Sequence, residues 1–168
     1  MEIRDYILYV LEHYNQMRAE MDTLRFELQN LNRIKDSEII ESMTFATPQG
    51  ERVNTSERTD KTSRIALAYK EQRNRIQAEA VQELAGHLSQ LALEIERLDF
   101  YIGQLPPFEA SILKEHYFEN YSWRELQDLK GISTKTLIRR RDEAVAKLVQ
   151  LYEPLARIGL LESPYFPE

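Results

Sequence analysis

Apolar residues in the first 31 positions of the chain step alternately by four and three. This spacing places them along one stripe of an α-helix, in the heptad pattern of a coiled coil. A long helix with such a stripe is not stable alone in water, so the stripe has to pack on another helix. The stripe consists of Ile3, Ile7, Val10, Tyr14, Met17, Met21, Leu24, Leu28 and Leu31.

A second long helix is expected from about residue 59 to residue 102. Its clearest seam comprises Val81, Leu84, Leu88, Leu91, Ile95, Leu98 and Ile102. The earlier residues Ile65, Tyr69 and Ile76 are out of phase with that seam, which indicates a stutter or a change of partner. We therefore predict an all-α protein whose residues 1–104 form a long antiparallel helical hairpin. A dimer of such hairpins is the next simplest arrangement.

The two expected helices are separated by a polar insert at about residues 37–58. Pro48, Gln49 and Gly50 predict a turn there, between two short runs that could alternate as strands. The insert is thus either a small β-hairpin or a loop at the tip of the helical hairpin.

Residues 105–152 have the pattern of three short helices with a tight corner between the last two. Ser122 and Glu125 form a capping box that predicts the start of the second helix. Gly131 suits the left-handed conformation at a helix end, and Ser133 suits the cap of the third helix. These signals predict a helix-turn-helix, a module that binds DNA through its last helix.

Helical geometry separates a packed face of the third helix from an exposed one. Leu137, Ile138, Ala144, Val145 and Leu148 share one side, and Lys135 and Arg139 point away from it. Arginine and lysine can contact guanine edges and phosphates, while short hydroxyl residues allow close approach of the backbone. Arg141 lies within the apolar stripe, where it would reach a phosphate or an acid of its own domain. The candidate DNA-binding residues are Ser133, Thr134, Lys135, Thr136, Arg139, Arg140 and, on the preceding helix, Arg124.

The residues of this module resemble a known class of proteins. The features that carry the resemblance are His116-Tyr117-Phe118, Tyr121-Ser122-Trp123, Glu125-Leu126, Gly131-Ile132-Ser133, Thr136-Leu137 and the arginine run. They resemble region 4 of sigma factors, and they also resemble the late-transcription regulators of bacteriophages and prophages of the ArpU and RinA type. The second resemblance covers more of the chain, because those regulators carry the module behind a long helical segment. It implies a cytoplasmic activator of late genes that binds double-stranded DNA and contacts RNA polymerase.

Two positions depart from the helix-turn-helix pattern. Gln127 stands where alanine is usual, and Lys130 stands where an apolar residue is common before Gly131. We expect Leu129 to supply that apolar contact one position early.

The net charge of −6 is unevenly distributed, since residues 105–152 carry eight basic and seven acidic side chains. The acidic remainder of the chain predicts modest nonspecific affinity for DNA. There are no cysteines, and no apolar run approaches the roughly 18 residues that a bilayer requires. The three histidines are His13, His87 and His116. None has the spacing of paired metal ligands, and none has a neighbour that would form a recognisable nucleophile site. We therefore expect neither an enzyme nor a cofactor, and no membrane association.

The last segment, residues 153–168, is apolar for a terminus, and Pro154 suits the first turn of a separate short helix. We expect this tail to pack on the module or on a partner. Two alternatives to a transcription regulator stay open. One is the DNA-recognition subunit of a phage packaging machine, similar to a small terminase; the other is a coiled-coil adaptor that binds protein.

Overall fold

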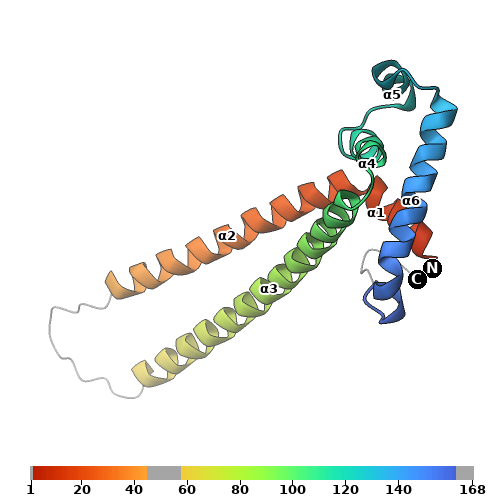
Figure 1. The fold of residues 1–168 in the computed structure, drawn as a ribbon. Coiled ribbons are helices and arrows are strands. Elements are labelled where there is room, and N and C mark those ends of the chain that lie inside the picture. Colours follow the sequence, from red (N-terminus) through yellow and green to blue (C-terminus); the bar gives the residue numbers. More distant parts are fainter. Residues whose placement is uncertain (1, 45–57, 162–168) are drawn as a thin grey trace. The chain divides into compact units, whose positions relative to one another are not determined.

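The computed structural model describes residues 2–44 and 58–161, and this part of the chain is all-helical, as predicted (Figure 1). No strand occurs in the described ranges. Residues 41–44, in the first arm of the possible β-hairpin, are helical, and residues 45–57 lie outside the described part. The elements are α1 (Ile3–Glu12), α2 (Tyr14–Thr44), α3 (Arg58–Gly103), α4 (Pro107–Leu113), η1 (Lys114–Phe118), α5 (Trp123–Lys130) and α6 (Thr134–Arg157).

The described residues divide into two compact units, and the division differs from the expected domains. Unit 1 comprises residues 2–19 and 91–161, and unit 2 comprises residues 20–44 and 58–90. The expected boundary at residues 104 and 105 is absent because α1 packs directly on α6 (Figure 1). The C-terminal module therefore shares its core with both ends of the predicted hairpin segment.

A buried polar cluster joins α1, α3 and α6 within unit 1. The hydroxyl of Tyr6 donates a hydrogen bond to the carboxylate of Glu94, and Arg97 Nη1 donates to Glu94 Oε1 at 2.8 Å. The ring of Tyr152 lies edge-on to Tyr6 and to Tyr101, at centroid distances of 5.8 and 4.8 Å. Because Glu94 and Arg97 pair with each other, the free-energy penalty of burying their charges is reduced.

The start of α2 also belongs to unit 1. The Tyr14 hydroxyl lies 3.1 Å from both carboxylate oxygens of Asp99, and the Tyr14 ring stacks on Phe118. Asn15 Nδ2 donates to the carbonyl oxygens of Tyr117 and Phe118 at 3.1 and 3.0 Å. These carbonyls end η1, a π-helical turn, so Asn15 satisfies acceptors that the end of a helix leaves free.

Three boundaries differ from the sequence-based expectation. The first long helix is interrupted at His13, whose Nδ1 lies 2.8 Å from the carbonyl oxygen of Tyr9. Helix α2 continues to Thr44, which shortens the expected insert. Pro154 lies inside α6 instead of starting a new helix. Gly159, with φ 69°, then ends α6, since Leu160 N–H bonds to the Leu155 carbonyl in a Schellman arrangement.

Two apolar residues in the described part of the tail are exposed, whereas Leu155 and Leu161 are half-buried. Ile158 is 68% exposed and Leu160 is 53% exposed. The expected packing of these two side chains on the module is therefore not found. Tyr165 and Phe166 lie outside the described residues.

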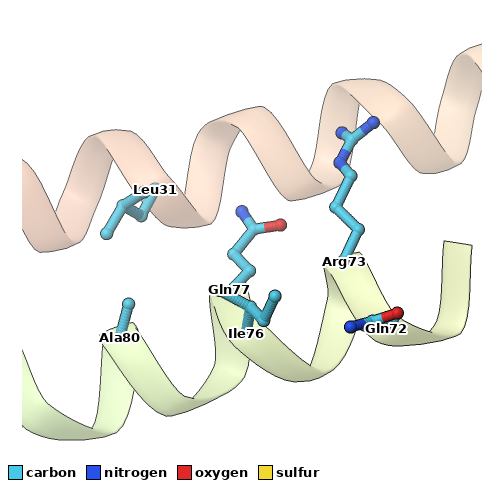
Figure 2. A pocket seen from close by; sticks show the side chains of 6 residues that line it. All are labelled: Leu31, Gln72, Arg73, Ile76, Gln77 and Ala80. Atoms are coloured by element: carbon cyan, nitrogen blue, oxygen red, sulfur yellow. The ribbon is translucent and has the colours of Figure 1, made fainter. Parts of the chain in front are cut away.

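Unit 2 consists of stretches of α2 and α3. Its seam residues Met21, Leu24, Leu28 and Leu31 are half-buried, as are Val81, Leu84 and Leu88. A cavity of about 450 Å³ lies between Leu31 of α2 and a set of α3 side chains (Figure 2). His87 Nε2 lies 3.7 Å from Glu20 Oε1. The side chains of this unit thus fill the seam incompletely.

Candidate nucleic-acid interface

Helix α5 begins and ends as the sequence predicts. Ser122 Oγ accepts a hydrogen bond from the backbone N–H of Glu125, and the Glu125 side chain accepts from the backbone N–H of Ser122. The Glu125 carboxylate also accepts from the Ser122 hydroxyl at 2.7 Å. This bond, followed by the bond from the Ser122 backbone N–H, lowers the pKa of Glu125, because both favour its charged form. Gly131 has φ 65° and ends the helix in the left-handed region, which glycine adopts without steric cost. The corner between α5 and α6 is therefore defined by local chemistry.

The hydroxyl residues at the start of α6 are engaged in capping. Ser133 Oγ accepts from the backbone N–H of Thr136 at 3.3 Å. Gln127 Oε1 accepts from both the backbone N–H and the hydroxyl of Thr134, at 3.2 and 2.7 Å. This explains Gln127 in place of alanine, since its amide oxygen acts as a second cap from the neighbouring helix. Ser133, Thr134 and Thr136 thus stabilise and position the N-terminus of α6.

The corner packs on a small apolar cluster. Ile112, Leu126 and Leu137 are fully buried, and Trp123 and Ile132 pack against them. These residues come from α4, α5 and α6 or adjoin them, so the three helices share one core.

Leu129 lies on the surface and Lys130 packs inward, whereas we expected Leu129 to supply the inward contact. Leu129 is 63% exposed, so the prediction that it supplies an inward contact is wrong. Lys130 instead lies inward: its Nζ is 3.1 Å from Ser111 Oγ and 2.9 Å from Glu115, above the ring of Phe108. A lysine can bury its methylene stem and still pair its ammonium group, which explains a charged residue at this position.

Two of the candidate cations have no acidic partner among the described residues. Lys135 and Arg124 are both exposed, and neither forms an ion pair with another residue that the structure describes. Lys135 lies in the first turn of α6, and Arg124 lies in the first turn of α5. Both ammonium and guanidinium are thus available to an external anion.

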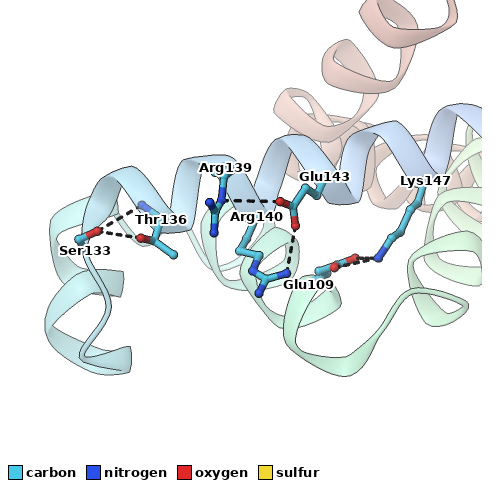
Figure 3. A network of polar contacts seen from close by, with 7 residues as sticks. All are labelled: Glu109, Ser133, Thr136, Arg139, Arg140, Glu143 and Lys147. Atoms are coloured by element: carbon cyan, nitrogen blue, oxygen red, sulfur yellow. Dashed lines mark hydrogen bonds and ion pairs between the residues drawn. The ribbon is translucent and has the colours of Figure 1, made fainter.

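The next two candidates share one acid. Arg139 Nε lies 3.6 Å from Glu143 Oε1, and Arg140 Nη1 lies 3.0 Å from Glu143 Oε2 (Figure 3). All three side chains are on the exposed side of α6, with 68%, 44% and 42% of the side chain exposed, respectively. Sequence reasoning did not identify Glu143, although its spacing of four and three residues from the arginines is that of helical ion pairs.

Other cations of α6 are committed to the fold. Arg141 Nη1 donates to the Tyr117 hydroxyl at 3.1 Å, and Arg141 Nε lies 3.1 Å from Asp142. Of the two alternatives expected for Arg141, a phosphate or an acid of its own domain, the structure shows the second. Lys147 Nζ donates to both oxygens of buried Glu109, at 2.8 and 2.6 Å, and so joins α6 to α4 (Figure 3).

Within residues 2–44 and 58–161, no three histidine, cysteine or acidic side chains are grouped in a way that could hold a metal ion. No described helix combines the length and the apolar character that crossing a membrane requires. Comparison with protein-family models, with curated proteins and with solved structures finds no match to this chain.

Proposed function

We propose that this chain is a sequence-specific DNA-binding regulator of transcription, with α5 and α6 as a helix-turn-helix whose second helix enters the major groove. The observation that carries the proposal is the exposed pair Lys135 and Arg139. They lie one turn apart, about 6 Å along the axis, in the first two turns of α6. Such a pair at the start of a helix that follows a tight corner suits contacts to base edges.

The other candidates take supporting roles. Arg124 and Arg140 flank this pair and would contact phosphates, which fix the protein on the duplex. Capping by Ser133 and Gln127 fixes the direction in which α6 leaves the corner. The hydroxyls of Thr134 and Thr136 are short enough to let the helix approach the groove closely.

The long helices would serve assembly. In this proposal α2 and α3 form an antiparallel hairpin, and a second chain covers its half-buried seam. A dimer would double the number of phosphate contacts, which offsets the acidic charge of the rest of the chain. By its resemblance to the phage and prophage regulators, the protein would act on late genes in the bacterial cytoplasm and contact RNA polymerase.

The test is recovery of DNA from sheared source genome by the purified protein, followed by sequencing. We expect one enriched intergenic site, lost in the Lys135→Ala/Arg139→Ala variant. A Lys114→Ala/Arg157→Ala variant also removes two positive charges, but outside the corner between α5 and α6. This control should still enrich the same DNA site. Equal recovery by all three proteins would contradict a reading role for α6, whereas rings of many subunits in solution would favour a packaging subunit.

A further inference from the structure

We infer that Glu143 restrains Arg139 and Arg140 in the free protein and so limits their attraction to polyanions, nonspecific DNA in particular. The inference rests on the proposed function, because it assigns to one acid the control of affinity at the same surface. Its basis is a single carboxylate that uses both oxygens, one for each arginine, at 3.6 and 3.0 Å.

Asp142 and Glu109, two other acids on or near α6, have structural partners. Asp142 lies 3.3 Å from Arg4 of α1 and 3.1 Å from Arg141, so it helps to dock α1 on α6. Glu109 is buried and binds Lys147. Glu143 joins no two elements, because both of its partners lie on its own helix one turn earlier. Its contacts therefore add little to the fold and act mainly on the two arginines.

The strength of these contacts suits a restraint that DNA can displace. Ion pairs between exposed side chains are weak, since water and salt screen them. A row of phosphates offers each arginine a denser negative charge than one carboxylate. Binding therefore has to break both ion pairs, and this lowers the affinity for every duplex, whatever its base sequence. Lys135 and Arg124 have no acidic partner among the described residues, so their contacts with DNA do not carry this penalty.

The unrestrained state can be tested with Glu143→Gln, which keeps the size of the side chain and removes its charge. We expect three- to tenfold tighter binding of a random-sequence duplex by fluorescence anisotropy at about 0.1 M salt. The slope of log affinity against log salt should steepen by about one. Later elution from heparin, a polyanion without bases, should accompany these changes.

Glu153→Gln is the matched control. Glu153 lies about 15 Å further along α6 and pairs with Arg157 at 3.2 Å, so this variant makes the same change in net charge away from the candidate surface. Equal shifts for the two variants would overturn the inference, since only net charge would then matter. Loss of the Glu143→Gln gain when Arg139 and Arg140 are also alanine would support it.

Heparin separates this inference from the proposed function. A Glu143→Gln shift on heparin larger than that of Glu153→Gln supports the restraint even if no duplex binds, and that result would contradict DNA recognition. The same elution for the wild type and both variants, together with a sequence-specific duplex complex, would overturn the restraint and leave the proposed function intact.

Discussion

The same heptad pattern is buried in unit 1 and half-buried in unit 2. Leu91, Leu98 and Ile102 have no exposed surface, whereas Val81, Leu84 and Leu88 on the same helix keep part of theirs. In unit 1 the additional helices α1, α4 and α6 enclose the core, while in unit 2 two helical stretches face each other across a cavity. A heptad seam thus predicts which face of a helix is covered, but not how completely.

The first prediction sharpens this contrast with two equal truncations. Leu98→Ala should lower the free energy of unfolding of unit 1 by about 2–5 kcal/mol, because it empties a closed site. Leu28→Ala should cost less than about 1.5 kcal/mol, because its site is open and the transfer from water is partial. Urea titration would measure both, with fluorescence of Trp123 for unit 1 and circular dichroism for the whole chain.

Protein concentration decides what a large Leu28→Ala effect would mean. If a second chain covers the seam of unit 2, that effect should shrink on dilution, since the contacts of Leu28 with the second chain are lost when the chains dissociate. Equal and concentration-independent losses for the two variants would contradict the difference in burial.

The sequence predicted the elements of the fold better than their association. Heptad spacing and capping residues act over a few positions, so the helices, the capping box and the Gly131 corner were predictable. Contacts such as Arg4 with Asp142 or Asn15 with Tyr117 join residues more than 100 positions apart, and no local pattern encodes them. The unit boundaries depend on these contacts. This is why the units do not divide at residue 104, where we expected a boundary.

The candidate site shows the same division. The exposed positions of Lys135 and Arg139 follow from helical periodicity, as expected. The inward position of Lys130 does not, because it depends on Ser111 and Glu115 of the preceding elements. The spacing of Glu143 from the two arginines could have predicted their ion pairs. The capping contact of Gln127 with Thr134 could not be predicted in this way, because it forms only when the corner is folded.

The second prediction compares the polar contacts of the two units. Arg97→Met removes the cation that pairs with Glu94 at a mostly buried position, and it should lower the stability of unit 1 by about 3 kcal/mol. His87→Ala removes the half-exposed contact to Glu20 in unit 2 and should change stability by less than about 0.5 kcal/mol. Thermal unfolding of both variants, followed by circular dichroism, would show a clear loss only for Arg97→Met. A larger loss for His87→Ala would reverse the order of the two units.

The third and smallest prediction concerns tyrosine ionisation in unit 1. Burial raises the pKa of Tyr6 and of Tyr152, and the nearby carboxylate of Glu94 raises both further. Since unfolded tyrosine loses its proton near pH 10, the stability of unit 1 should be constant below about pH 10 and fall above it. The urea midpoint of Trp123 fluorescence, measured between pH 8 and pH 11, would test this dependence.

Tyr152→Phe is the control for that pH series. The Tyr152 hydroxyl is buried and has no hydrogen-bond partner within the described part of the chain, so its removal should not reduce stability at neutral pH. The variant should also lose less stability above pH 10 than the wild type does. A marked loss at pH 7 would indicate a hydrogen bond that Tyr152 makes in solution.

The contacts of Asn15 with the end of η1 have a consequence for how the protein is made. They join residues 102 and 103 positions apart, and the chain between them includes all of unit 2. During synthesis, α1 leaves the ribosome long before α6 exists, so its apolar face has no native partner until most of the chain has been translated. Closing so long a loop is slow, although its entropic cost grows only with the logarithm of loop length. We therefore expect unit 1 to be the last part of the chain to fold, and changes in the length of unit 2 to alter its folding rate more than its final stability.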